Sequence, residues 1–312
     1  ANQVVVTNGD GVSGNPTLSL PQSIATSSNP QFATIEVGAA SDTTLSRSAA
    51  GVLAVEGVNL VRSTEVRERL TAARTYYVRT DGSNSNTGLA NTAGGAFLTL
   101  QKAWDVMVTL DLGGQVCTLK LGNTASTFTG LFTTTSPVGG TVIIEGDTST
   151  PSNTTITDTF GIYIEAPCYV TVKHLKLVCS YGIWAKGSGT KIIMGLGIIF
   201  GASVAMITAS VSGYVYMVAF EIAGNTTYGL YATLGGVIES TTMTVTLTGT
   251  PVFTVFALCE ASASMSIFGA TWTGAATATR YSVTLNGVIN TFAGNVFPGA
   301  TAGSTATGGQ YA

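Results

Sequence analysis

Charge is the scarcest property of this sequence, because Asp, Glu, Lys and Arg together make up only 9% of its 312 residues. A typical soluble domain has about 25%. The net charge is −3, and the absence of any basic tract excludes the electrostatic signature of a nucleic-acid-binding protein. No apolar run reaches the roughly 18 residues of a bilayer-spanning helix, so we expect no membrane insertion. A repetitive β structure that also buries surface between subunits fits a chain with so few solvated groups.

Histidine and cysteine are scarce as well. The single histidine is His174, and none of the four cysteines stands in a CxxC pair, which argues against a zinc site. We therefore expect no metal and no cofactor. Free cysteine ordinarily packs as a small hydrophobic group, so we expect reduced thiols in the core. They are Cys117, Cys168, Cys179 and Cys259.

The region 1–62 is rich in Gly, Ser and Thr, and its short alternating runs lie between turn signals. Each run is half polar, so none can bury a core by itself. We predict a β-rich attachment region in which strands from three chains wind around one axis. The alternative is a partly disordered leader. The runs cover residues 4–6, 17–20, 33–37 and 51–55.

The region 63–75 carries the densest charge in the chain. Its apolar residues Val66, Leu70 and Ala73 recur at helical spacing and form a narrow stripe. This pattern predicts a short helical neck with a solvated charged face.

One amphipathic helix is predicted over residues 99–112, within a region 76–140 that we expect to begin a β-helix. Thr99 is the expected N-cap, and Gly113 with Gly114 ends the helix. A single helix ahead of a long all-β stretch is expected to cover the open end of the stacked strands, where unpaired backbone would otherwise face water. Its apolar positions are Leu100, Ala103, Trp104, Met107 and Leu110.

A drifting repeat follows, and it predicts coils of an all-β, right-handed parallel β-helix over residues 141–300, with a tail over 301–312. Each interval of about 21 to 26 residues holds two or three short β-forming runs separated by Gly, Ser or Asn. A β-sandwich with regular turns is the alternative. The repeat is longer than one strand and one turn, which favours the β-helix. Equivalent positions begin at Gly161, Gly182, Ala205, Gly229, Thr254 and Arg280.

The repeat also predicts one side-chain pair. Glu165 and Lys186 each stand four residues after their glycine anchors, so they should stack on adjacent coils. An exposed pair of this kind contributes only about 0.2–1 kcal/mol, and it helps to fix the register.

Several stretches resemble bacteriophage tail-fibre and tailspike proteins. The segments 7–16 (TNGDGVSGNP), 42–47 (DTTLSR) and 51–57 (GVLAVEG) are similar to stretches of such virion proteins, and 76–104 looks like the opening of pectate-lyase-like β-helix domains. The end, residues 280–311, also looks like the close of phage proteins of this kind.

The resemblance implies a homotrimeric tail fibre or spike that attaches the particle to the host surface. The N-terminal region would bind other phage tail or baseplate proteins, and the C-terminal part would face outward, with a host surface glycan as the candidate partner. Such a protein is assembled in the host cytoplasm and belongs to the virion.

Catalytic candidates are few. Depolymerase tailspikes commonly cleave glycans with two carboxylates, and the candidates here are Glu145, Asp147 and Asp158. Glu145-Gly146-Asp147 also fits a strand end that runs into a turn, and the sequence shows no cluster of acids and bases for a lyase. We expect a non-catalytic attachment protein. The alternatives are a surface-polysaccharide depolymerase (glycosidase or lyase), with a site made between subunits included, and a purely architectural collar or head fibre.

Aromatic side chains are the remaining candidates for a binding role, because exposed rings stack on sugars. Trp184, Tyr231 and Trp272 are the sugar-binding candidates. The loop 81–88 has one carboxylate among several amide and hydroxyl oxygens, and we expect it to form turns rather than a calcium site.

Overall fold

The computed structural model describes residues 67–122, 125–201, 203–292 and 297–312, together with short stretches before residue 67. The chain divides into two compact units, Ala1–Val66 and Arg67–Ala312. The stretches described in the first unit are residues 5–7, 12, 14, 17–19, 34–36, 44–49, 52–55 and 58–59.

The first unit contains two antiparallel sheets. A hairpin pairs Val5 with Ser19 and Thr7 with Thr17, and a second sheet has the strand order β3-β4-β5-β6. Strands are therefore confirmed at all four predicted runs, whereas β4 and β6 were not predicted. The winding of three chains stays a prediction. The strands are β1 (Val5–Thr7), β2 (Thr17–Ser19), β3 (Thr34–Glu36), β4 (Thr44–Ala49), β5 (Val52–Val55) and β6 (Val58–Asn59).

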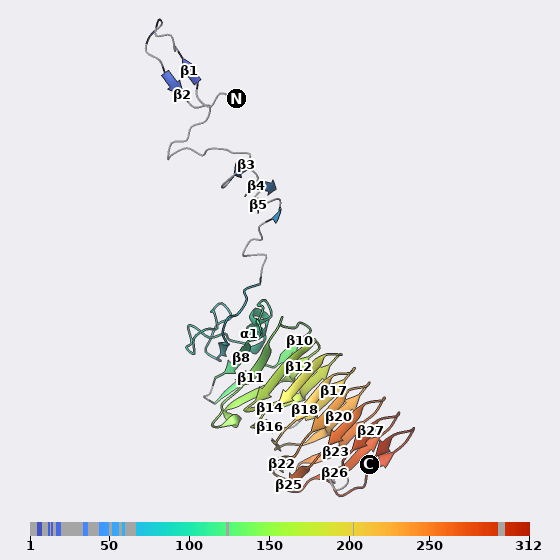
Figure 1. Ribbon diagram of the computed structural model, residues 1–312. Helices are drawn as coiled ribbons and strands as arrows, with labels where there is room; N and C mark the ends of the chain where they lie inside the picture. Colours follow the sequence, from blue (N-terminus) through green and yellow to red (C-terminus); the bar gives the residue numbers. More distant parts are fainter. Residues whose placement is uncertain are drawn as a thin grey trace. The chain divides into compact units, whose positions relative to one another are not determined.

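The second unit is a solenoid of stacked coils, visible in Figure 1 as parallel arrows that run from green to red. Each coil contributes a strand to a ten-stranded sheet, here called the first sheet, and all strand pairs in it are parallel. Its strands are β7 (Arg74–Val78), β8 (Val116–Leu121), β11 (Thr141–Glu145), β13 (Cys168–Lys173), β15 (Thr190–Met194), β18 (Tyr214–Met217), β21 (Val237–Ser240), β24 (Ser264–Ile267), β27 (Val288–Asn290) and β29 (Gln310–Tyr311).

The second sheet has thirteen strands, and it forks at β14, whose two halves pair with β16 and β17. Later coils are therefore three-sided. The strands are β9 (Ser126–Phe128), β10 (Leu131–Thr133), β12 (Thr154–Ile164), β14 (Leu175–Lys186), β16 (Ile198–Phe200), β17 (Ser203–Ser210), β19 (Phe220–Ile222), β20 (Thr226–Thr233), β22 (Met243–Leu247), β23 (Val252–Cys259), β25 (Ala270–Thr273), β26 (Thr277–Val283) and β28 (Ser304–Thr305); a short 3₁₀ turn, η1 (Pro151–Asn153), precedes β12.

The core consists of columns of like residues, one from each coil. Along the second sheet, Ile162, Ile183, Ile207, Leu230 and Ala257 lie in register, and all are buried. A single coil cannot bury such a face, so the columns form only when coils stack. This confirms the predicted all-β parallel β-helix.

The register differs from the predicted one in two coils. The sequence placed Met206 and Val255 at the positions that Ile207 and Ala257 occupy. The later difference amounts to two residues and is uniform along β23, whose pairing with β20 has no bulge.

The cysteines are free thiols, as predicted, and three of the four are buried, with Cys168 partly buried. Burial raises the pKa of Cys117, Cys179 and Cys259 to about 11. These thiols therefore stay protonated at neutral pH and pack as small apolar groups.

The capping helix α1 (Leu100–Met107) packs against the early strands β7, β8 and β10. Thr99 caps it by accepting a hydrogen bond from Lys102 N, and Trp104 on its inner face is fully buried. The helix is confirmed but ends earlier than residue 112, since the Thr109 hydroxyl donates to Val106 O at 2.7 Å and breaks the regular pattern. No helix within the described residues is long and apolar enough to cross a membrane.

Two predicted segments have a different structure. Residues 67–75 are not helical. Leu70 N donates a hydrogen bond to Asp111 O, Asp111 N donates one to Glu68 O, and β7 begins at Arg74. One buried apolar residue, Leu70, does not support a helix, and residues 63–66 lie outside the described residues. The predicted tail 301–312 is instead part of the solenoid, because β28 and β29 extend the two sheets.

Truncating an inward residue should destabilise the solenoid. Ile183→Ala removes a fully buried side chain, and we expect a loss of about 2–5 kcal/mol in the free energy of unfolding, from lost burial and the cavity left behind. Ile193→Ala is the matched control, because Ile193 is only partly buried on the first sheet. Denaturant unfolding measures both variants, and equal losses would contradict the assigned register.

Candidate functional site

The catalytic candidate Glu145 lies in a ladder of charged residues on the first sheet. Lys120, Glu145 and Lys173 stand in register on three successive strands, β8, β11 and β13. The Glu145 carboxylate lies 3.2 Å from Lys120 Nζ and 2.9 Å from Lys173 Nζ, and its Oε1 is 3.5 Å from His174 Nδ1. Partial burial acts to raise the pKa of the Glu145 carboxyl, but hydrogen bonds from Lys173 and Lys120 outweigh it and lower the pKa.

The sequence reasoning missed this convergence. Lys120, Glu145 and Lys173 are separated from one another by about one coil length. Extending the repeat upstream of residue 140 would have predicted that they lie side by side. The residue types suit a lyase. Both ammonium groups, however, are directed at Glu145 and not at an open cleft, which makes the ladder a set of internal ion pairs.

The other two acidic candidates accept hydrogen bonds from backbone N–H groups. Asp147 accepts hydrogen bonds from Asn153 Nδ2, Thr150 N and Ser149 N, all between 2.9 and 3.0 Å, and these bonds lower its pKa. A carboxyl group that is held ionised in this way is a poor general acid, because that role needs a raised pKa.

Asp158 accepts from Gly130 N at 3.2 Å and from Thr159 N at 2.7 Å. Neither Asp158 nor Asp147 shares a hydrogen-bond partner with Glu145. The three candidate acids therefore do not form one hydrogen-bond network within the described residues.

The second sheet carries an outward cluster of rings that we call the aromatic face. Phe132 stacks on Tyr163 with ring centroids 4.5 Å apart, and Phe160 contacts both. Tyr181 and Trp184 continue the cluster on the next coil, where Tyr163 meets Trp184 edge-on at 5.1 Å. Phe132 is half exposed, at 50%. The face is defined by Phe132, Phe160, Tyr163, Tyr181 and Trp184, with Tyr228 and Tyr231 two coils further on.

The coil between these two groups of rings carries small residues. Ala205 lies in register between Tyr181 and Tyr228, and Thr208 lies between Trp184 and Tyr231. Both small residues are fully buried, and Thr208 Oγ1 has no hydrogen-bond partner. The two groups of rings are thus separated by one coil of small, buried residues.

Polar side chains border the rings in a parallel column. Glu165 and Lys186 form the predicted ion pair at 3.0 Å, which confirms their register. The Tyr163 hydroxyl donates to Glu165 at 2.5 Å. The Trp184 indole N–H donates to Ser210 Oγ at 2.8 Å, which fixes the orientation of its ring.

Tyr231 and Glu260 repeat this arrangement further along the column. The Tyr231 hydroxyl donates to Glu260 at 2.8 Å. Burial, together with that hydrogen bond, raises the pKa of Tyr231 to about 12, so it remains a donor at neutral pH. Two of the predicted sugar-binding residues, Trp184 and Tyr231, therefore belong to the same face.

A recess of about 230 Å³ opens beside the aromatic face. Phe132 and Phe160 line it with rings, and Asp158 and Gln101 line it with oxygen atoms. Rings next to a few polar groups are the usual composition of a small-molecule site. Asp158, a catalytic candidate in the sequence, thus lies where it can accept hydrogen bonds from a ligand.

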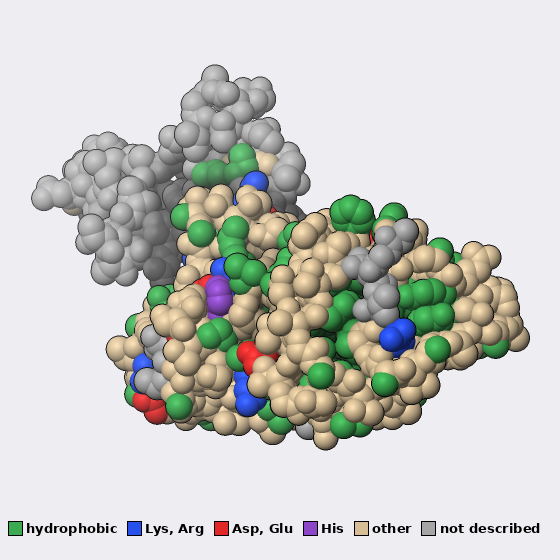
Figure 2. All heavy atoms as spheres, turned by 90° about the horizontal axis from the view of Figure 1, so that it is seen from below, with side chains coloured by type: hydrophobic (Ala, Val, Ile, Leu, Met, Phe, Trp, Pro, Cys, Tyr) green, Lys and Arg blue, Asp and Glu red, His purple; other side chains and the backbone are tan. Residues whose placement is uncertain are grey.

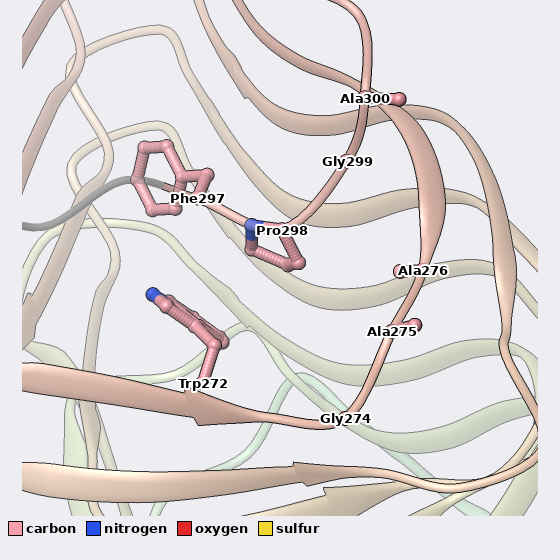
Figure 3. A pocket seen from close by; sticks show the side chains of 8 residues that line it. All are labelled: Trp272, Gly274, Ala275, Ala276, Phe297, Pro298, Gly299 and Ala300. Atoms are coloured by element: carbon pink, nitrogen blue, oxygen red, sulfur yellow. The ribbon is translucent and has the colours of Figure 1, made fainter.

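The third sugar-binding candidate, Trp272, lies elsewhere, on β25. Its ring packs edge-on against Phe256 at 4.9 Å and lies 5.9 Å from Phe297, and its Nε1 is buried without a hydrogen-bond partner. It lines a separate cavity of about 400 Å³ whose other lining residues are Gly, Ala, Pro and Phe (Figure 3). None of the described lining residues offers a carboxylate, amide or hydroxyl side chain.

The predicted turn role of the loop 81–88 agrees with its contacts. Asp81 pairs with Arg79 through two bonds of 2.8 and 2.9 Å, and Asn84 Oδ1 accepts from Leu98 N and Thr99 N. Within the described residues, no three His, Cys, Asp or Glu side chains are grouped to hold a metal ion.

No protein-family model, no curated protein and no solved structure matches this chain. The resemblance to phage proteins therefore rests on the sequence motifs alone.

The charged ladder should stabilise the fold in a pH-dependent way. Glu145→Gln leaves two lysines without their counter-ion, and we expect a loss of about 2 kcal/mol at pH 7. Because the folded pKa of Glu145 is lowered from 4.5, this contribution is present above that value and disappears as the pH falls through the lowered pKa. The difference between the two proteins in denaturant unfolding should shrink accordingly.

Glu165→Gln is the matched control, since that carboxylate is 36% exposed and a surface pair contributes at most about 1 kcal/mol. A cost for Glu145→Gln that does not change with pH would show that its charge is not the cause.

Proposed function

We propose that this chain is the β-helical body of a phage tail fibre or spike, which attaches the virion to its host by binding a surface glycan. The N-terminal unit connects it to the rest of the tail, and three copies assemble into one appendage. The particle is assembled in the host cytoplasm. The resemblance of the sequence motifs supports the phage setting, and the parallel β-solenoid is a suitable rigid body for such an appendage.

The aromatic face is the observation that carries the binding role. Its rings, apart from the buried Tyr163, are partly exposed, and hydroxyl and carboxylate groups border them over several coils. Sugars present C–H faces that stack on such rings and hydroxyl groups that bond to the border. A repeated face of this kind suits a repeating polysaccharide, because successive sugar units can meet equivalent positions.

The ion pairs and hydrogen bonds of the candidate catalytic acids favour binding without cleavage. Glu145 is paired with two lysines, and Asp147 is saturated by turn bonds. Asp158 stands beside the rings, but no second carboxylate lines its recess. Glycosidases need two carboxyl groups on opposite sides of one bond.

Assembly of three copies is supported by an exposed apolar ridge. Val211, Leu234 and Leu285 occupy equivalent turns between the second and first sheets, and they are 42%, 58% and 51% exposed. All three have φ near +50°, a conformation that costs bulky residues about 1–2 kcal/mol and that Asn or Gly adopts more readily. Large apolar residues at such turns become stabilising when another copy of the chain buries them. Figure 2 shows a surface on which charged side chains are few.

Glycan binding should depend on the aromatic face. Trp184→Ala and Tyr231→Ala are each expected to weaken binding of the host surface polysaccharide about tenfold, from lost stacking area. Tyr169→Ala is the control, because Tyr169 is 41% exposed on the first sheet. Affinity electrophoresis in gels that contain the polysaccharide measures all three.

Unchanged binding by the Trp184 and Tyr231 variants would contradict this site, and new reducing ends or unsaturated products would overturn the non-catalytic role. A fall in the number of subunits in these variants would instead make the aromatic face a subunit interface.

The ridge makes a separate prediction. Leu234→Asn with Leu285→Asn should convert the trimer to monomers while it leaves the thermal stability of each solenoid unchanged or higher, because Asn tolerates the left-handed backbone. Sedimentation equilibrium measures the mass. Leu89→Asn is the control, since Leu89 is 53% exposed outside the ridge; a trimer that persists in the double variant would exclude the ridge as the interface.

A further inference from the structure

The anionic groups beside the aromatic face are carboxylates, which accept hydrogen bonds. Glu260 receives the Tyr231 hydroxyl at 2.8 Å and the Thr233 hydroxyl at 3.4 Å, both on Oε1. Within the described part of the chain its second oxygen receives no hydrogen bond. A ligand that reaches this oxygen has to supply the donor.

The recess beside Phe132 and Phe160 has the same character. Gln101 donates its amide N–H to Asp105 at 2.8 Å, and Asp158 accepts two backbone N–H groups. Each carboxylate oxygen has two lone pairs, so Asp158 can accept further bonds. Gln101 Oε1 already accepts from Phe132 N at 3.2 Å, so Asp158 is the charged acceptor that the recess offers to a ligand.

The net charge around the rings is negative. Asp158, Glu165 and Glu260 border the face, and Lys186 is the cation within the polar column. Lys186 is committed to Glu165 at 3.0 Å and lies 6.0 Å from the centre of the Tyr163 ring. It compensates one carboxylate and leaves the other two without an ion-pair partner among the described residues.

We infer that the aromatic face selects glycans whose contacting units carry no acidic group, meaning neutral or amino sugars, and that it rejects uronic and sialic acid units. This inference rests on the proposed function and adds the class of ligand. Hydroxyl and ammonium groups donate to Asp158 and Glu260, whereas a sugar carboxylate at the same place meets like charge.

The lysines of the charged ladder do not offset this selection. Lys120 and Lys173 are held by Glu145 on the first sheet, whereas the aromatic face belongs to the second sheet. The cation that an acidic glycan meets beside the rings is therefore Lys186, which is already paired with Glu165.

The test is a printed panel of neutral, amino and acidic oligosaccharides, probed with the full-length protein at low ionic strength, where charge effects are largest. We expect retention on neutral or amino members and at least about fivefold weaker retention on acidic members of matched size. Acidic members that bind as well as matched neutral ones would overturn the inference while they leave glycan attachment intact. If no member is retained, the proposed function fails, and the inference fails with it.

A double variant, Glu165→Gln with Glu260→Gln, tests the cause of the selection. It keeps the shape of both side chains and removes their charge, so binding of acidic members should rise about fivefold or more, and neutral binding should change less. Glu221→Gln is the matched control, because Glu221 bonds to Thr248 at 2.8 Å on the other branch of the second sheet. A ratio of acidic to neutral binding that is the same in wild type and double variant would show that these carboxylates do not exclude acidic sugars.

Discussion

The parallel backbone ladder between coils is the constraint on which the rest of this structure depends. Hydrogen bonds join each coil to the next, so every side chain stands directly above its equivalent, at the roughly 4.8 Å spacing of neighbouring strands. The ladder gives the inward isoleucines their continuous column and brings the rings of the aromatic face into contact. It also constrains charge, since like charges in one column would repel. Lysine and glutamate accordingly alternate along Lys120, Glu145 and Lys173.

The same ladder explains why much of the fold was predictable from the sequence. Gly161-Ile162-Tyr163 and Gly182-Ile183-Trp184 have nearly identical patterns, and the structure places them in register, with Glu165 beside Lys186. Thr99 and the apolar spacing after it were enough to identify α1 and its buried side. These features follow from short sequence patterns, so they can be predicted directly from the sequence.

The features that were not predicted depend on contacts distant in sequence. The helical spacing of Val66, Leu70 and Ala73 predicted a helix, but the backbone near Leu70 bonds to Asp111 instead. No local sequence pattern reveals this contact. The binding candidates Trp184 and Tyr231 belong to one face, and Trp272 does not. Which side chains share a face could not be predicted, because that requires the register of every intervening coil. The convergence of Lys120, Glu145, Lys173 and His174 was missed for the same reason.

The uneven length of the coils has an evolutionary consequence. Ile162 and Ile183 are closer in sequence than Leu230 and Ala257, yet both pairs are equivalent neighbours in one column. Turns thus absorb the differences in length while the columns keep their register. Insertions at the corners can therefore lengthen a turn while the inward columns keep their register.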